Sequence, residues 1–287
     1  MTPFECHAGP LSEAERNARI YAGHILVFRD VPALKRLTTR LAGMARDHLG
    51  FDPASAHLNL AENGQSEAAS ALRKLAARDA GAKALLARTL EDVGVDLDVT
   101  YRDPLKLRFQ PPAQDQSDSL VAPLAAHRDT WGANIMAQTN WWAPALPIAA
   151  NRTMAIFPGA FRTAVTNDSA SWDLVEFLEA REAGEPYPLL PLASDPPDWS
   201  AAVPIVIEPG DLMAFSGAHL HASVPNTSDA TRLSLEVRTV NGPDAHAGCG
   251  APNVDGRAPW IPYNWFKHVR DRSPLGQRTR ARLSGGG

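Results

Sequence analysis

The sequence predicts a mainly β protein with flanking helices, an antiparallel sandwich or jelly roll that follows a helical N-terminal region. Three observations lead to this fold class. Apolar residues recur at helical spacing within the first hundred residues. After Gly94 the chain changes to short apolar segments that are separated by proline, glycine and asparagine. Residues 105–110 alternate apolar and polar side chains, as a strand with one buried face does. Short strands with such turns are typical of jelly rolls.

The first 98 residues are expected to be mostly helical. Ser12 and Glu15 have the spacing of a capping box, and Pro32 suits the first turn of a helix. The apolar residues of this second helix recur at helical spacing and should face the core: Val31, Leu34, Leu37, Leu41 and Met44. A further helical stretch covers about 66–90, with a break expected near Gly81. Between the helices, residues 25–28 predict a short strand.

Residues 99–243 are expected to form the β core. Besides 105–110, the predicted strands are 133–142, 153–157, 203–207, 212–215 and 232–240. A helical insertion is expected near 171–183, and 244–287 forms a C-terminal extension within a single domain that spans residues 1–287. The extension ends in an arginine-rich stretch followed by three glycines. A solvated, disordered end is favoured there over a tail that binds nucleic acid.

The bulk composition excludes several classes of function. The chain of 287 residues has 28 basic and 32 acidic side chains, so no overall basic field recruits nucleic acid. No apolar stretch approaches the length of a membrane span, and the first ten residues lack the features of a secretory signal. We therefore expect a cytoplasmic protein with a small-molecule substrate and with its two cysteines reduced.

A histidine and a carboxylate two residues apart, His127 and Asp129, stand far upstream of a second histidine, His221. If 127–129 is a strand, both side chains point to the same face while Arg128 points away. Two imidazoles and one carboxylate occupy one face of an octahedral metal ion, as in non-haem Fe(II) oxygenases. Arg232, which opens the predicted strand after His221, suits a carboxylate because its guanidinium binds such groups in bidentate fashion.

Two histidines compete for the last ligand position. His219 and His221 share one face if their segment is extended. The sequence that follows, up to Arg232, favours His221 as the ligand. His219 is then expected beside the site or at the surface.

At these residues the chain resembles the Fe(II)/2-oxoglutarate-dependent dioxygenases, most closely the phytanoyl-CoA hydroxylase-like group. The resemblance covers about residues 100–240. It depends on residues 107–112 (LRFQPP), 127–131 (HRDTW), 210–215 (GDLMAF), 221–226 (HASVPN) and Arg232.

The resemblance implies a double-stranded β-helix, the cupin-like form of the jelly roll, with His127, Asp129 and His221 on Fe(II). It also implies that Arg232 binds the distal carboxylate of the co-substrate 2-oxoglutarate, with Ser223 beside it. Asn140 and Lys106 occupy strand positions where relatives contact the co-substrate, although the residue types differ. The implied reaction consumes O2 and releases succinate and CO2 while a C–H bond is hydroxylated or desaturated. In halogenating relatives a small residue replaces the carboxylate ligand, so Asp129 argues against halogenation.

Three further residues are candidates for substrate contact. Trp131 follows the metal triplet closely, and either touches substrate or packs in the core. Arg108 and Gln110 share a strand face with Lys106, and either bind a polar substrate or form a solvated row. A non-catalytic jelly roll that holds a metal or another ligand is the rival function, because zinc accepts the same residue types. Arg232 with Ser223 is the feature that favours the enzyme.

Overall fold

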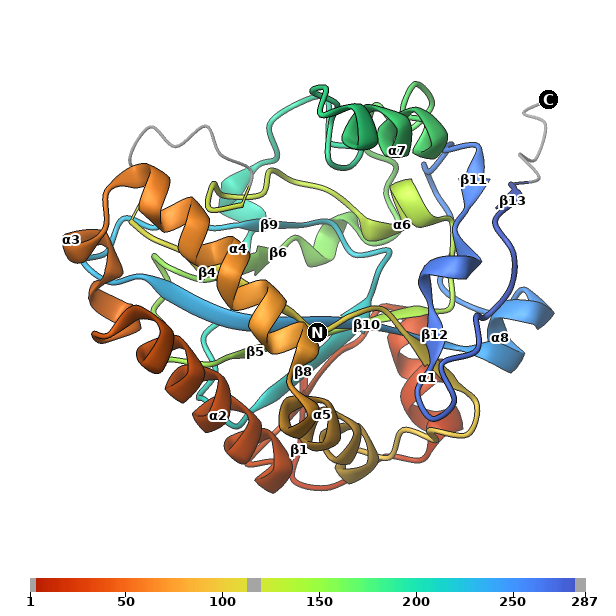
Figure 1. Ribbon diagram of the computed structural model, residues 1–287. Coiled ribbons are helices and arrows are strands. Elements are labelled where there is room, and N and C mark those ends of the chain that lie inside the picture. The colour runs from red at the N-terminus through yellow and green to blue at the C-terminus, as the bar shows by residue number, and fades with distance from the viewer. Residues whose placement is uncertain (1–3, 113–119, 282–287) are drawn as a thin grey trace.

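A computed structural model of the chain describes residues 4–112 and 120–281 (Figure 1). The three terminal glycines, for which disorder was expected, lie outside these ranges. The N-terminal part contains helices α1 (Glu13–Ala22), α2 (Pro32–Leu49), α3 (Ala56–Asn59), α4 (Glu62–Arg78) and α5 (Ala80–Asp92). The expectation of a mostly helical N-terminal region is confirmed, and three short strands accompany the helices: β1 (Phe4–His7), β2 (Ile25–Phe28) and β3 (Thr100–Arg102).

Local sequence signals explain where the first helices begin and end. The Ser12 hydroxyl accepts a hydrogen bond from the backbone N–H of Glu15 at 3.3 Å, as an N-cap does. The long helical stretch divides two residues earlier than expected, at Asp79 instead of Gly81. The Asp79 carboxylate accepts from the N–H of Ala82 at 2.6 Å, so this residue ends α4 and caps α5.

Among the described residues, the largest sheet has eight strands. Its order is β1, β2, β8 (Leu212–Ser216), β5 (Gln138–Pro144), β10 (Arg232–Asn241), β3 and β12 (Lys267–His268), and β4 (Lys106–Gln110) also pairs with β10. A smaller sheet contains β7 (Val203–Pro204), β6 (Met154–Ile156) and β9 (His221–Ser223), and a third contains β11 (Trp260–Ile261) and β13 (Thr279–Arg280). The remaining helices are α6 (Asp129–Ala133), α7 (Leu174–Ala183) and α8 (Gly242–Ala247), and the 3-10 turns are Pro53–Ser55, Pro158–Ala160, Trp199–Ala201 and Tyr263–Trp265.

The two faces of β10 divide the molecule into a core and a cavity. Leu233, Leu235 and Val237 are buried in a large apolar cluster with residues of α2, α4 and α5. These three helices therefore cover one side of the large sheet (Figure 1). The alternate residues of β10, beginning with Arg232, point to the opposite side because successive side chains of a strand alternate. A second apolar cluster joins this opposite side to the small sheet through Trp142 and Ile156.

Two predicted strands are wrong in extent. The segment 133–142 begins as a strand only at Gln138, because residues 129–133 form α6 and Asn134 ends that helix in the left-handed region, with φ of 51°. The segment 203–207 contributes only two residues of strand, Val203–Pro204. Its remaining apolar residues Ile205 and Ile207 still pack in the core between the sheets.

The helices within 4–112 and 120–281 include none that is both long enough and apolar enough to span a membrane.

Candidate active site

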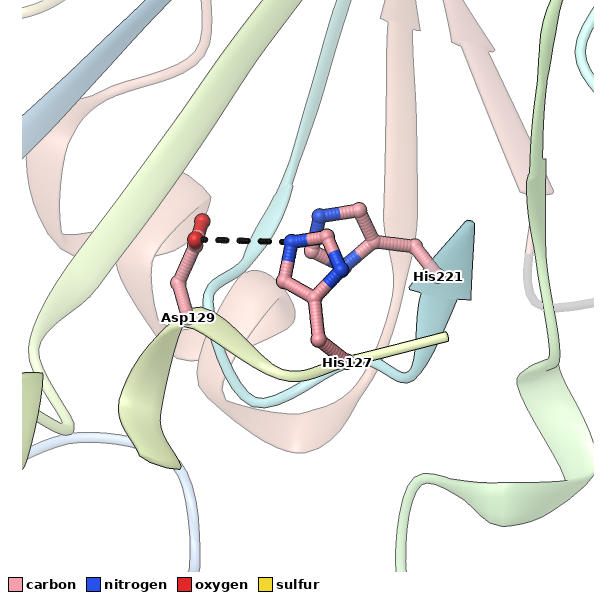
Figure 2. A group of neighbouring side chains, drawn as sticks. All are labelled: His127, Asp129 and His221. Atoms are coloured by element: carbon pink, nitrogen blue, oxygen red, sulfur yellow. Dashed lines mark ion pairs between the residues drawn. The ribbon is translucent and has the colours of Figure 1, made fainter. Parts of the chain in front are cut away.

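Three potential metal ligands meet where the small sheet ends. The ligand atoms of His127, Asp129 and His221 all lie within 4.8 Å of one another. Figure 2 shows the two imidazole rings side by side, with the carboxylate facing them. His221 opens β9, and its backbone exchanges two hydrogen bonds of 3.0 Å with His127. This antiparallel bridge fixes the distance between the two histidines, although they are far apart in the sequence.

Each of the two histidines presents one nitrogen to the site. Nδ1 of His127 lies 2.8 Å from the carbonyl of Ala125, and Nδ1 of His221 lies 3.0 Å from the carbonyl of His219. Because a carbonyl only accepts, Nδ1 carries the proton in both rings and Nε2 keeps its lone pair. Burial and the neighbouring His221 also lower the pKa of His127 to about 3, so its ring is neutral. Neutral rings with a fixed tautomer are ready to bind a metal.

Asp129 is held as a carboxylate with one oxygen toward His127. Its Oδ1 lies 3.9 Å from Nε2 of His127, whereas its Oδ2 accepts hydrogen bonds from the amides of Gln138 and Asn140. Burial alone would raise the pKa of Asp129, but Arg238 and the two histidines outweigh it, so the pKa lies well below its usual range. The site thus offers two imidazole nitrogens and one anionic oxygen.

The middle residue of the triplet, Arg128, points away from the ligands as expected. The guanidinium donates to the carbonyls of Ala218, Ala160 and Thr163, and pairs with Asp255 at 3.1 Å. The sequence pattern explained this orientation by a strand at 127–129, and that explanation is wrong because 127–129 is not a strand. Arg128 has extended dihedrals, with φ of −114° and ψ of 135°, and caps α6, which Asp129 begins. One extended residue is enough to place its two neighbours on the same side.

His219 lies beside the site without contributing a ligand atom to the cluster of three. It is fully buried, and its two ring nitrogens lie 3.2 Å from the carbonyls of Ser216 and Gly23. Burial lowers its pKa to about 4. The geometry therefore gives His219 a packing role between the loop and the end of α1.

Arg232 is buried in the cavity without an acidic partner among the described residues. Its exposed fraction is 2 %, its Nη1 donates to the carbonyl of Thr153 at 2.6 Å, and its Nε has no hydrogen-bond partner. Burial and the positive charge of Arg108 lower its pKa to about 9. A buried cation with unfilled donors is costly unless an anion binds there.

Other unpartnered polar atoms surround Arg232. In the strand register, Gln110 lies opposite Arg232, Arg108 lies opposite Ser234, and Trp142 lies opposite Glu236. Buried atoms without a hydrogen-bond partner gather on this face of the sheet: Nε of Arg108, Oε1 of Gln110, Nε1 of Trp142, Nε of Arg232 and Oγ of Ser234. Such a group is unusual in a protein interior and is typical of a place where a polar ligand binds.

A cavity of about 890 Å³ joins the metal cluster to Arg232. Of the residues expected from the sequence, it is lined by His127, Asp129, His221, Ser223, Arg232, Asn140, Lys106 and Arg108. The cavity is within the size range of small-molecule sites. Arg108 and Gln110 are 3 % and 1 % exposed, so they do not form the solvated row that was the alternative for them. Gln110 donates to the carbonyl of Val224 at 3.4 Å and is not among the lining residues.

Two expected contacts differ in the structure. Trp131 of α6 is fully buried and is not among the lining residues, and its indole N–H donates to Asp255 at 2.6 Å. It therefore packs in the core, and the expectation of substrate contact does not hold in this structure. Lys106 does line the cavity, but its ammonium pairs with the buried Asp103 at 2.9 Å.

Several residues of the site were not singled out from the sequence. Arg73 of α4 and Trp172, Phe177 and Tyr187 line the cavity, and Asp103 pairs with Arg238 at 2.7 Å. Gln138 had a local signal, because it stands two residues before Asn140 on one strand face. Asp255 had none, since its partners Arg128 and Trp131 are more than 120 residues away in the chain.

The model of the phytanoyl-CoA dioxygenase family matches residues 163–234 of the chain. This segment is about a quarter of the sequence and includes His221, Ser223 and Arg232, but not His127 or Asp129. The match confirms the resemblance that the sequence motifs indicated. Among curated proteins, none was found to match the chain.

Several solved structures are similar to this chain at low identity. The epimerase SnoN, solved with Fe3+, alpha ketoglutarate and nogalamycin RO, is 13 % identical with a TM-score of 0.45, over 79 % of this chain and 83 % of SnoN. EvdO2 from Micromonospora carbonacea var. aurantiaca, complexed with 2-oxoglutarate, is 12 % identical with a TM-score of 0.46, over 82 % and 93 %. The carbocyclase SnoK is 16 % identical with a TM-score of 0.42, over 85 % and 96 %. With TM-scores below 0.5, these likenesses carry no weight for the reaction of this chain.

Proposed function

We propose that this protein is an Fe(II)/2-oxoglutarate-dependent oxygenase that hydroxylates or desaturates a C–H bond of a small molecule. One observation carries the proposal. A buried arginine without an acidic partner among the described residues, Arg232, lines the same cavity as a two-histidine, one-carboxylate cluster. A metal site alone would not need this cation, and an anion site alone would not need the cluster.

The residues fit an iron ion. His127 and His221 each offer an Nε2 lone pair, and Asp129 offers a carboxylate oxygen, within 4.8 Å of one another. This donor set is the facial triad of non-haem Fe(II) oxygenases, which leaves positions open for co-substrate and O2. Iron bound there would activate O2 at the expense of 2-oxoglutarate, which is converted to succinate and CO2.

The residues also fit a dicarboxylate co-substrate. The guanidinium of Arg232 has unfilled donors, and the hydroxyl of Ser234 on the same face has no partner. Both groups match a carboxylate, and Ser223 lines the cavity beside them. We propose that the distal carboxylate of 2-oxoglutarate binds Arg232 while its other end reaches the metal cluster. The pKa of Arg232, lowered to about 9 mainly by burial, would rise when the anion binds.

The protein's own groups then have separate roles. Gln138 and Asn140 hold Oδ2 of Asp129, so the carboxylate keeps one orientation. The carbonyls of Ala125 and His219 hold the two imidazoles. The buried floor of the cavity keeps water from the co-substrate, which strengthens the ion pair with Arg232.

We further propose that the two facing sheets form a double-stranded β-helix within one domain of residues 1–287. The support is that β6 of the small sheet, which pairs with β9, shares a core cluster with β5 and β8 of the large sheet. In this arrangement the described residues of 1–98 support the outer face, those of 99–243 form the core with its insertion near 171–183, and those of 244–287 pack beside it. Asp255, in the last segment, supports the loop of Arg128.

Coupled turnover tests the proposal against a non-catalytic metal-binding protein. The protein, Fe(II), 2-oxoglutarate and a panel of candidate substrates are mixed in air, and succinate, O2 and substrate mass are followed. Succinate and O2 consumption that depend on both Fe(II) and 2-oxoglutarate are expected, with a mass increase of one oxygen for hydroxylation. Stoichiometric metal binding with no succinate under any condition would support the rival function instead.

A further inference from the structure

We infer that the substrate is an amphipathic anion, an aromatic or similarly apolar carboxylic acid whose carboxylate binds Arg73 and Arg108. This inference rests on the proposed function, because it names the molecule that occupies the rest of that cavity. The support comes from the two walls of the cavity, which differ sharply in chemistry.

The first wall is a mainly apolar roof formed by α7, the segments on either side of it, and the C-terminal part of the chain, with Arg181 and Glu185 as its charged members. Its side chains include Trp172, Phe177, Tyr187 and Trp265. The ring of Phe177 lies 5.8 Å from that of Trp172 and 6.3 Å from that of Tyr187, measured between centroids. In Figure 1, α7 lies beside α6, which begins at the metal ligand Asp129.

The roof approaches the metal loop closely. Gly132 of α6 lines the cavity, and a side-chain carbon added there would lie 3.3 Å from Cδ of Pro191 and 3.6 Å from Trp172. An apolar molecule under this roof would therefore reach the metal cluster directly. A cluster of aromatic side chains favours flat apolar groups, because the contact area is large and the rings are held in place.

The second wall is basic. Arg108 of β4 is 3 % exposed, its Nη2 donates to the carbonyl of Ala122 at 2.8 Å, and its Nε has no partner. Arg73 of α4 lines the same cavity, with Nε 3.4 Å from the carbonyl of Leu107, the residue before Arg108. Neither guanidinium has an ion pair among the described residues. Burial lowers the pKa of Arg108, and the charge of Arg73 adds to this effect, whereas Glu236 acts in the opposite direction. Arg73 and Arg108 therefore lie within electrostatic reach of each other.

On the sheet side of the cavity, several other charged side chains are already paired within the described residues. Lys106 and Arg238 share the buried carboxylate of Asp103, and Arg128 pairs with Asp255. Under the proposed function, the co-substrate takes Arg232 and the metal takes Asp129. Within residues 4–112 and 120–281, Glu236 is then the carboxylate that acts on Arg108, and a single carboxylate does not neutralise two guanidinium groups. A substrate anion would supply the missing negative charge.

The choice of a carboxylate follows from the geometry. Arg108 is buried between the core and the cavity, so it presents its free donors in one direction to a small planar acceptor. The apolar body of the same molecule would extend from this wall toward the roof. A neutral molecule of the same shape would leave both cations unpartnered, and should therefore bind more weakly.

Matched acids and amides test the inference. The anaerobic Fe(II) and 2-oxoglutarate complex is prepared first, and its metal-to-ligand charge-transfer band shows that the co-substrate is in place. Phenylpropionate, indole-3-acetate and 1-naphthylacetate are then titrated, each beside its primary amide, and the perturbation of the band gives an affinity. At least one acid should bind about tenfold more tightly than its amide, since a charge-assisted hydrogen bond is lost in the amide.

Two variants on one helix locate the charge effect. Arg73→Gln should weaken the acid about tenfold and leave the amide unchanged. Lys74→Gln is the matched control, because Lys74 is the exposed neighbour on α4 and does not line the cavity. It removes the same charge and should change neither affinity. In both variants the affinity for 2-oxoglutarate should equal that of the wild type.

The outcomes separate this inference from the proposed function. If the charge-transfer band forms but no acid binds better than its amide, the substrate class is wrong while the oxygenase remains. If Arg73→Gln and Lys74→Gln weaken the acid equally, the preference for acid over amide comes from the long-range field of the positive charges. That result would overturn the assignment of Arg73. If the band does not form in the wild type, the proposed function itself has failed.

Discussion

Two buried arginines, Arg128 behind the metal loop and Arg232 on the floor of the cavity, have opposite surroundings. Both are almost inaccessible, at 1 % and 2 % exposure. Arg128 donates to three carbonyls and pairs with Asp255, whereas Arg232 has one carbonyl partner and an unpartnered Nε. The first arginine is satisfied by the fold. The second is not, which indicates that the fold leaves its donors for a ligand.

The same difference holds for the regions around them. Behind the metal loop, Trp131 and Val165 also donate to Asp255, so one carboxylate joins three chain segments. On the cavity floor, Ser234 and Gln110 each have a buried polar atom without a partner. Natural proteins keep such atoms mainly where function requires them. The comparison therefore separates residues that stabilise the site from residues that bind within it.

The largest effect is expected from removal of a metal ligand. His221→Ala should abolish stoichiometric Fe(II) binding and all succinate formation, because one of three ligand atoms is lost. His219→Gln should retain both, since the His219 side chain contacts Phe161 and the carbonyls of Ser216 and Gly23 and adds no ligand atom to the cluster of three. Metal content after dialysis and succinate formation measure this. Retention of iron by His221→Ala, with loss in His219→Gln, would reverse the assignment of the loop histidine.

Asp129→Gly should also remove turnover rather than create a halogenase. The substitution deletes a ligand and leaves Arg238 and Asn140 facing an empty position. Succinate formation in chloride buffer should fall to background, with no chlorinated product by mass spectrometry. A wild-type protein that chlorinates a substrate under the same conditions would contradict the oxygenation proposal.

The stability of the metal-free protein should distinguish the two arginines. Arg128→Met leaves Asp255 buried without its cation and should lower the free energy of unfolding by about 3–5 kcal/mol. Arg232→Met removes a cation that has no acidic partner among the described residues, so the free energy of unfolding should stay unchanged or rise. Urea denaturation of both variants measures this. Equal destabilisation by the two substitutions would mean that Arg232 is also a structural residue.

A smaller effect is expected from the residues that orient Asp129. Asn140→Ala removes a hydrogen bond to Oδ2 of the carboxylate, so Fe(II) affinity should fall by about tenfold or more. The carboxylate itself remains, and turnover should recover at saturating Fe(II). Activity measured against Fe(II) concentration tests this, with Thr139→Ser on the same strand as a control. If Asn140→Ala behaves like Asp129→Gly, Asn140 acts in the reaction and not only through Asp129.

Local patterns in the sequence predicted the parts of this molecule that depend on neighbouring residues. The Ser12 cap, the strand at 106–110 and the alternation of β10 follow from short-range periodicity and are present in the structure. The three potential ligands are brought together as the resemblance implied. The helix at Asp129 was missed because His127 and Asp129 satisfy a strand pattern equally well, and only Asn134 marks the turn that follows.

Contacts between distant segments were beyond local patterns. Asp255 and Trp131 meet across 124 positions of sequence, so the burial of Trp131 away from the cavity had no signal nearby. The roof beside α6 also depends on contacts between distant segments, because Trp172 comes from the insertion and Trp265 from the C-terminal extension. Pattern alone identifies which residues carry chemistry here, whereas the fold decides which of them face the cavity.

The central claim is that one cavity holds iron at the three ligands and 2-oxoglutarate at Arg232. Anaerobic titration of 2-oxoglutarate into the Fe(II) protein, with the metal-to-ligand charge-transfer band as the signal, tests both halves together. The wild type should form the band at saturable concentrations. Arg232→Ala should weaken the apparent affinity by about 30-fold or more while Fe(II) binding persists, and Arg232→Lys should recover only part of it. If the iron-loaded wild type forms no band, or if Arg232→Ala binds 2-oxoglutarate with unchanged affinity, then 2-oxoglutarate does not bind between the metal cluster and Arg232.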